Sequence, residues 1–225
     1  MITLRFSIVD GVPAPDTAAP AVRFRLHIDN PSPARIHALA LRVQVQIEPR
    51  SRAYDDEERA RLYELFGDGS TWERSRQPLL WTHASTVVTA FDRETEVDLL
   101  VACTYDLDVA SAKFLHAVRK DDVPLRFLFS GTIFGVVDGA LNVQPVPWQS
   151  EADYRLPADV WQQTMDQFFP GGGWMRVSRE TLDRLQAWRG VRACISWDET
   201  LDALMRAAAT DHASRGAIHM TREPA

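Results

Sequence analysis

Six histidines are the side chains of this chain best suited to bind a metal or to move protons near neutral pH. They are His27, His37, His83, His116, His212 and His219. None belongs to an HxH or HExxH motif or to an i, i+4 pair on a plausible helix, the spacings that supply two adjacent ligands. A site formed by His83 and His116 with Tyr105 and Asp106 would therefore need the fold to bring these residues together. Packing or surface roles explain each of them without a ligand, so the sequence predicts neither a metal nor a cofactor.

Nucleophilic catalysis has equally little support. The chain lacks the G-x-S-x-G elbow, the dinucleotide-binding fingerprint and the S-x-x-K motif. A triad is defined by geometry rather than by sequence order, so Ser85 or Ser130 could still pair with a histidine in the folded protein. Ser130 falls inside a predicted strand, however, where a hydrogen bond to the next strand explains its hydroxyl. Turns explain the acidic pair Asp121–Asp122, and the sequence predicts no catalytic residue.

The glycine-containing segment 67–78, GDGSTWERSRQP, resembles a phosphate-binding loop only superficially. No Gly-Lys-Ser/Thr follows it, and the sequence does not predict a helix opening there, as a phosphate loop requires. We therefore expect a polar loop that carries Trp72.

Seven tryptophans are a high number for 225 residues, and most fall at the ends of predicted elements. Tryptophan is favoured both in seams between packed layers and in interfaces with partners. The sequence favours seams, because a helical end must attach to the rest of the chain, but a partner surface remains open. Together with the polar residues above, the candidate binding residues are Trp72, Trp81, His83, Tyr105, Asp106, His116 and Trp161.

Composition restricts the class of protein. A formal charge of −6 with dispersed arginines argues against nucleic-acid binding, which requires a basic patch. No apolar run approaches the length of a membrane span, and the N-terminus lacks the features of a signal peptide. Cys103 and Cys194 are expected to be buried, reduced thiols, with a disulfide possible only in an oxidising compartment. These features predict a cytoplasmic protein.

The segment 35–48, RIHALALRVQVQIE, anchors the predicted fold, and it alternates without a fault from His37 to Ile47. A period of two places successive side chains on opposite faces of a strand. One face is apolar and consists of Leu39, Leu41, Val43, Val45 and Ile47. The other face carries Arg42, Gln44 and Gln46, and this asymmetry is typical of an antiparallel sheet. The alternating segment 22–28 precedes it across a turn, so an antiparallel hairpin of the two is expected, with Arg23, Arg25 and His27 on the shared polar face.

Further alternating segments and helix signals predict an α+β fold, with an antiparallel β-sandwich-like body of about seven or eight strands in residues 1–150. Asp55 and Glu58 have the spacing of a helix start, which predicts one inserted helix over 55–66. Segment 104–118 fits a helix better than a strand. After Trp148 the pattern changes, and we expect a module of about three helices over 151–209, docked on the body, with Ser178 and Ser196 as caps. Residues 210–225 are expected to form a flexible tail.

Long segments of the chain resemble an uncharacterised bacterial family known only as a domain of unknown function. The resemblance covers nearly the whole chain and is carried by IEPRSRAYDDEERARLYELFGDGSTWERSRQPLLWTH (47–83), CTYDLDVASAKFLHAV (103–118), PLRFLFSGTIF (124–134), VPWQSEADYRLP (146–157) and VWQQTMDQFFPGGGWMRVSRETLDRL (160–185). It implies an association with operons of actinobacterial-type, oxygen-tolerant NiFe hydrogenases, and hence a role in hydrogenase expression, maturation or assembly. The resemblance implies no reaction and no catalytic residue.

The leading functional hypothesis is therefore a non-catalytic accessory or scaffold protein that binds a protein partner, such as a hydrogenase subunit or maturation factor. The alternative is a small-ligand- or metal-binding protein, or a hydrolase, with a pocket near His83, Tyr105, Asp106 and His116. Stoichiometric metal retained after chelation would favour the alternative.

Overall fold

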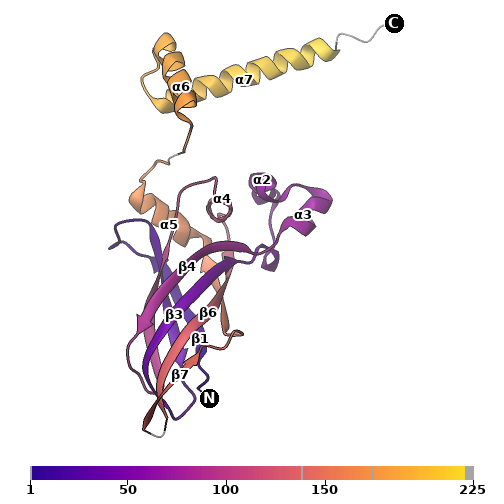
Figure 1. The fold of residues 1–225 in the computed structure, drawn as a ribbon. Coiled ribbons are helices and arrows are strands. Elements are labelled where there is room, and N and C mark those ends of the chain that lie inside the picture. The colour runs from indigo at the N-terminus through magenta and orange to yellow at the C-terminus, as the bar shows by residue number, and fades with distance from the viewer. Residues whose placement is uncertain (1, 138, 174, 221–225) are drawn as a thin grey trace. The chain divides into compact units, whose positions relative to one another are not determined.

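A computed structural model describes residues 2–137, 139–173 and 175–220, with side chains up to residue 210 (Figure 1). The chain divides into two compact units, residues 1–175 and 176–225, which we call the body and the C-terminal unit.

Two antiparallel sheets form the body, as the alternating segments predict. The smaller sheet has the order β1-β2-β5, with β1 at Arg5–Pro13, β2 at Ala21–Asp29 and β5 at Glu94–Ala102. The larger sheet has the order β4-β3-β6-β7, and β8 also pairs with β6. Its strands are β3 (Arg35–Ile47), β4 (Leu79–Val88), β6 (Asp122–Val137), β7 (Ala140–Pro145) and β8 (Glu151–Pro157). The α+β prediction with an antiparallel body is confirmed.

Strand β3 occupies the position that its alternation predicts. Leu39, Val43 and Val45 are fully buried, whereas Arg42 between them is exposed. The strand pairs on one side with β4 and on the other with β6, so it lies inside the larger sheet. A slip by one residue would exchange the buried and exposed faces, and the packing of this strand therefore fixes its register.

The predicted hairpin of 22–28 with 35–48 is wrong. β2 pairs with β1 and β5, whereas β3 lies in the other sheet, so the turn between them crosses from one sheet to the other. Asn30 is 2% exposed and stabilises this crossing, because its side-chain amide donates to the carbonyl oxygens of Ala34 and Asp92, both at 2.7 Å. The polar faces of the two strands therefore belong to different sheets. Alternation defines which face of a strand is buried, but it does not define the neighbouring strand.

Helices gather at one end of the strands, and β7 lies at the opposite end (Figure 1). The inserted helix is confirmed as α1 (Asp56–Arg61) and α2 (Tyr63–Phe66), and Asp55 caps it by accepting a 2.8 Å hydrogen bond from the Glu58 amide. The expected loop over 67–78 instead contains a third helix, α3 (Gly69–Ser75), in which Trp72 is buried. A short 3₁₀ helix, η1 (Pro49–Ser51), precedes the insertion, and α4 (Ala110–Ala117) resolves the ambiguous segment.

The body continues past residue 150, where the sequence placed its end. Residues 151–157 form β8 on the larger sheet, and α5 (Ala158–Phe168) packs on the body with Trp161 1% and Met165 2% exposed. The boundary between the two compact units lies at 175/176. Strand β8 was missed because the tight turn before it resembles the start of a new module.

Two helices form the C-terminal unit, α6 (Arg179–Arg192) and α7 (Trp197–Met220). Ser178 caps α6 by accepting from the Thr181 amide, and Ser196 caps α7 by accepting from the Glu199 amide, both at 3.1 Å. Both caps are as the sequence predicts. Helix α7 runs to Met220, where a flexible tail from 210 was expected, and residues 221–225 lie outside the described part of the chain.

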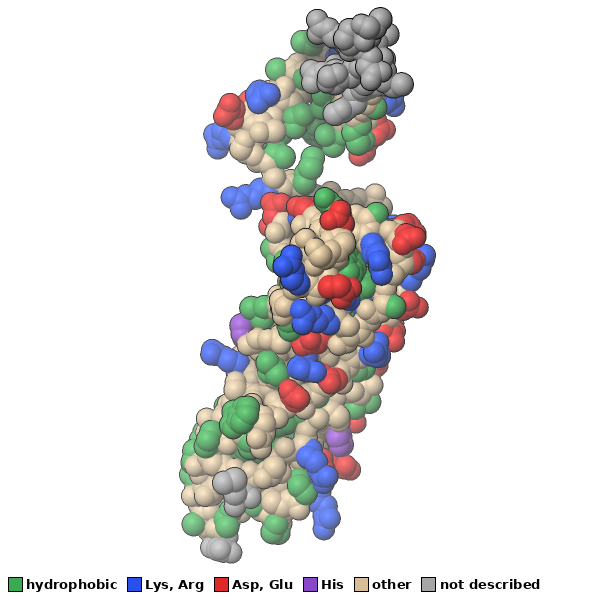
Figure 2. Space-filling model, turned by 90° about the vertical axis from the view of Figure 1, so that its right-hand side faces the viewer, with side chains coloured by type: hydrophobic (Ala, Val, Ile, Leu, Met, Phe, Trp, Pro, Cys, Tyr) green, Lys and Arg blue, Asp and Glu red, His purple; other side chains and the backbone are tan. Residues whose placement is uncertain are grey.

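On the side of the body where Figure 1 draws α2 and α3, acidic and basic side chains alternate, so no field of one sign covers this face (Figure 2).

Cys103 and Cys194 are both free thiols and half-buried, and burial raises the pKa of Cys103 to about 12. Among the described helices, none has the length and apolar character needed to cross a membrane.

Candidate functional site

Three of the seven candidate residues meet in one aromatic cluster between α4 and α5. The Tyr105 ring stacks on Trp161 with centroids 5.9 Å apart, and His116 approaches Tyr105 at 6.0 Å and Trp161 at 5.9 Å. Phe169, just beyond α5, closes the cluster at 5.5 Å from Tyr105. Gly173 also lies against Tyr105, since a Cβ there would be 3.0 Å from the ring. The sequence named the rings, and the packing of α4 on α5 brought them together.

The polar atoms of this cluster are incompletely paired. His116 Nδ1 and Trp161 Nε1 are buried, and no hydrogen-bond partner for them is found among the described residues. Burial lowers the pKa of His116, and the positive charges of Arg119 and Arg61 lower it further. The imidazole is therefore neutral at physiological pH, with a tautomer left free to pair with a polar guest or a water.

The other predicted residues lie elsewhere. His83 is exposed on β4, directly opposite Gln44 of β3, and therefore on the outer face of the larger sheet. Asp106 organises a turn, because its carboxylate accepts a 3.0 Å hydrogen bond from the Asp108 amide. Trp81 packs edge-on against Phe24 inside the sandwich at 6.2 Å. Of the four residues proposed for a ligand pocket, Tyr105 and His116 are therefore in contact, whereas His83 lies on the outer face of the sheet and the Asp106 carboxylate is engaged in its turn.

Trp72 belongs to a second cluster, formed within the helical insertion. Its indole is 5% exposed and makes edge-to-face contacts with Tyr54 at 5.2 Å and with Phe66 at 5.5 Å. The guanidinium groups of Arg59 and Arg76 each lie 5.5 Å from the centre of the indole. Cations at this distance from an aromatic face are attracted to it. The indole is therefore held rigidly between an apolar core and two arginines.

A pocket of about 370 Å³ opens beside this indole. Its lining residues are Asp56, Arg59, Ala60, Tyr63, Gly67, Asp68, Gly69, Trp72 and Glu73. The Tyr63 side chain is 59% exposed at its edge, and three carboxylates lie on the rim beside one arginine. An apolar wall with an acidic rim suits a side chain that has an apolar stem and a cationic end. We call this feature the insertion pocket.

Buried polar contacts anchor the insertion to the body. Arg52 Nη2 donates to both carboxylate oxygens of Glu58, at 3.0 and 3.1 Å, and the two side chains are 4% and 2% exposed. Arg61 Nε donates to the Ala117 carbonyl at 2.8 Å, which attaches α1 to α4. Breaking a buried ion pair leaves an unpaired charge, so these contacts resist displacement of the insertion. The walls of the insertion pocket are consequently pre-organised.

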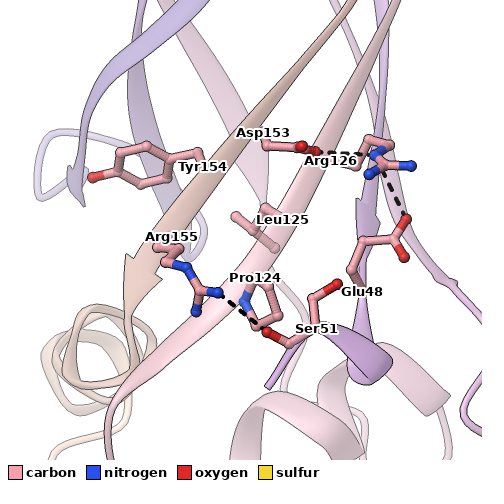
Figure 3. A pocket seen from close by; sticks show the side chains of 8 residues that line it. All are labelled: Glu48, Ser51, Pro124, Leu125, Arg126, Asp153, Tyr154 and Arg155. Atoms are coloured by element: carbon pink, nitrogen blue, oxygen red, sulfur yellow. Dashed lines mark hydrogen bonds and ion pairs between the residues drawn. The ribbon is translucent and has the colours of Figure 1, made fainter.

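A second, more polar pocket of about 410 Å³ lies where β3 ends beside β6 and β8. Figure 3 shows Arg126 reaching toward Asp153 and Glu48, at 3.0 and 3.9 Å, while Arg155 turns toward Ser51. Arg155 donates to the Ser51 carbonyl at 3.2 Å. The charges of this pocket are therefore engaged with one another. Within the described residues, no group of three or more His, Cys, Asp or Glu is arranged to hold a metal ion.

The sequence pointed to Trp72 but not to Arg59 and Tyr63, which also line the insertion pocket. A signal was available, because Arg59 and Tyr63 are four residues apart and therefore share a helix face. Helix α3 brings Trp72 against that face. The sequence did not predict this helix, because its composition is typical of a loop.

Comparisons with known proteins add one family assignment. Residues 1–213 match the family of unknown function DUF6084. A search of curated proteins finds no match. Among solved structures, a putative late embryogenesis abundant protein is 12% identical, with 70% of this chain and 75% of that chain covered at a TM-score of 0.32. β-Glucosidase 3B from Thermotoga neapolitana is 14% identical, with 68% and 17% covered at 0.25. Neither similarity bears on function.

Proposed function

The chain belongs to the DUF6084 family, whose function is unknown, and we propose that it is a non-catalytic accessory protein that binds a protein partner through the insertion pocket. The observation that carries the proposal is the exposed Tyr63 beside Arg59 and the rigid indole of Trp72. Tyrosine, tryptophan and arginine dominate the energetic centres of protein interfaces.

The rigidity of the pocket supports this proposal further. Binding costs free energy when side chains and loops must be ordered, and a pre-organised site avoids much of that cost. Here the Arg52–Glu58 pair and the aromatic neighbours of Trp72 hold the walls in place before any partner arrives. The acidic rim selects a partner that presents a lysine or arginine side chain at the centre of its own surface.

We further propose that this partner is a subunit or a maturation factor of a NiFe hydrogenase. This identification rests on the resemblance of segments such as 103–118 and 160–185 to a family associated with hydrogenase operons. The insertion pocket itself indicates which kind of side chain the partner should present, but not which protein the partner is.

Calorimetric titration of the purified chain against each hydrogenase subunit and each maturation factor tests both the role of the insertion pocket and the hydrogenase assignment. We expect one component to bind, and Tyr63→Ala to weaken that binding by about 30-fold, since a central interface tyrosine contributes about 2 kcal/mol. Leu141→Ala is the matched control, because Leu141 is 65% exposed on β7 at the other end of the body.

The hydrogenase assignment and the role of the insertion pocket can fail separately. If no hydrogenase component binds, the hydrogenase assignment is wrong, whatever the role of the pocket. If a component binds but Tyr63→Ala and Leu141→Ala have equal effects, the insertion pocket is not the binding surface. Tyr63 is exposed, so we expect its replacement to leave the melting temperature unchanged.

The unpaired atoms of the aromatic cluster favour a second candidate function, a small polar ligand held between α4 and α5. The rings of His116 and Trp161 have their centroids 5.9 Å apart, and His116 Nδ1 and Trp161 Nε1 lack hydrogen-bond partners among the described residues. A guest with one donor and one acceptor would satisfy both atoms. Native mass spectrometry of the freshly purified chain checks this, and a co-purifying small molecule lost on His116→Phe would support it.

A further inference from the structure

The C-terminal unit has two helices and almost no core. Helix α6 contains no buried residue, and Thr200 is the one buried side chain described between 176 and 210. Large apolar side chains are exposed instead, with Val191 at 88%, Ile195 at 86% and Met205 at 63%. Helices of this length owe their stability in proteins to the burial of an apolar face. The unit therefore needs another surface to pack against.

Each helix carries an apolar stripe suited to such packing. The stripe of α6 consists of Leu182, Leu185 and Trp188, and the stripe of α7 consists of Leu201, Leu204 and Met205. The spacings are three and four residues, which places the members of each stripe on one helix face. Between the helices lies a groove of about 250 Å³, lined by Thr181, Arg184, Leu185, Trp188 and Leu204. A groove of this size accepts side chains from a facing surface.

Local contacts set the geometry of the helix pair before it packs. Arg189 Nε donates to the Cys194 carbonyl at 3.1 Å, and the Arg189 guanidinium lies 5.0 Å from the centre of the Trp197 ring. Ala193 takes a left-handed conformation that ends α6, and Ser196 starts α7 three residues later. The turn between the two helices is thus pre-formed, and the helix pair, which we call the hairpin, keeps an open apolar side.

The two helices of the hairpin carry opposite net charges. Helix α6 has four arginines and two carboxylates, a net charge of +2, whereas α7 up to residue 210 has three carboxylates and one arginine, a net charge of −2. A surface with a basic half and an acidic half is complementary to itself when a two-fold axis lays each half on the other. We propose that the hairpin binds the hairpin of a second copy of this chain, with α6 of each copy facing α7 of the other.

Binding of a second copy accounts both for the exposed apolar stripes and for the opposite charges of the two helices. The apolar stripes of the two copies then meet and exclude water from the contact. The contact is isologous, so it closes at the dimer. The residues of the insertion pocket belong to the body and are not part of this contact.

Light scattering on the full chain, coupled to size exclusion, tests the proposal. We expect twice the mass of the 25.4 kDa chain. Arg184→Glu removes the net charge of α6 and should raise the dimer dissociation constant at least about tenfold at low salt. Arg42→Glu is the matched control, because it makes the same charge change at an exposed position of β3 in the body.

A rescue experiment keeps the test decisive if the first variant loses helix. Asp202→Arg removes the net charge of α7, and a mixture of the Arg184→Glu and Asp202→Arg chains should form the mixed dimer in preference to either homodimer. Native mass spectrometry measures the three species. A full chain that stays monomeric up to about 100 µM overturns the proposal and indicates that the hairpin packs on its own body. A dimer lost in Arg42→Glu but kept in Arg184→Glu, or a statistical mixture of dimers, also overturns it.

Discussion

The body and the C-terminal unit are both built from regular elements, yet they differ in what their apolar side chains do. In the body, Phe24, Val43 and Phe127 are fully buried between the sheets, and α5 adds Trp161 to the same core. In the C-terminal unit, side chains of the same types are exposed on well-capped helices. Caps and periodicity are local properties, whereas a core requires that elements face one another. The body is therefore expected to fold alone, and the hairpin to depend on association.

Truncation tests this difference most strongly. A chain ending at residue 175 should remain soluble and melt cooperatively, because it retains the whole compact body. A chain ending at 150 should aggregate, since it loses β8 from the edge of β6 and uncovers the core beneath Trp161. Circular dichroism and light scattering compare the two. A soluble, monomeric and folded 1–150 chain would show that β8 and α5 are dispensable.

Two substitutions at adjacent positions of β3 test the two faces of the body. Val43→Asp should destabilise the body by more than about 4 kcal/mol, because it places an unpaired charge in the sheet core. Gln44→Asp points to the outer face and should cost about 1 kcal/mol or less. Urea unfolding measures both free energies. Equal losses would show that the assignment of the faces is wrong.

Glycine replacement contrasts the packing of the body with that of the hairpin. Gly131 has φ +143°, and a Cβ there would lie 2.0 Å from the Ala40 carbonyl oxygen, so Gly131→Ala should cost about 3 kcal/mol. Gly190 lies inside α6 with open space around it, so Gly190→Ala should stabilise that helix by about 0.5–1 kcal/mol. Thermal unfolding followed at 222 nm detects both. Destabilisation by Gly190→Ala would indicate that another surface already covers this side of α6.

The smallest expected effect concerns the pH dependence of the body. Because the pKa of His116 is lowered in the folded state, the unfolded chain binds a proton first as the pH falls below 6.5. Stability should therefore be complete above that pH and decrease gradually below it, by a few degrees in Tm at most. His116→Phe should remove this part of the dependence, and the hairpin should not share in it. An unchanged pH profile in His116→Phe would assign the dependence to other groups.

The candidate site was only partly predictable, for reasons that differ from residue to residue. Tyr105, His116 and Trp161 could be named because aromatic and titratable side chains are conspicuous in a sequence. Their convergence could not, because it depends on how α4 and α5 pack across 56 residues of chain. Trp72 was named for the same reason, but Arg59 became relevant only when α3 folded back onto α1.

By itself, the sequence determined the local features of this protein. Alternation specified which face of β3 is buried, and the residues Asp55, Ser178 and Ser196 specified where helices begin, because a strand face and a helix cap involve neighbours only a few residues away. The tertiary structure alone decided that β2 and β3 belong to different sheets, that β8 completes the body, and that the insertion folds around Trp72. Those choices are made among distant segments with similar apolar faces, and only the simultaneous packing of all of them distinguishes one arrangement from another.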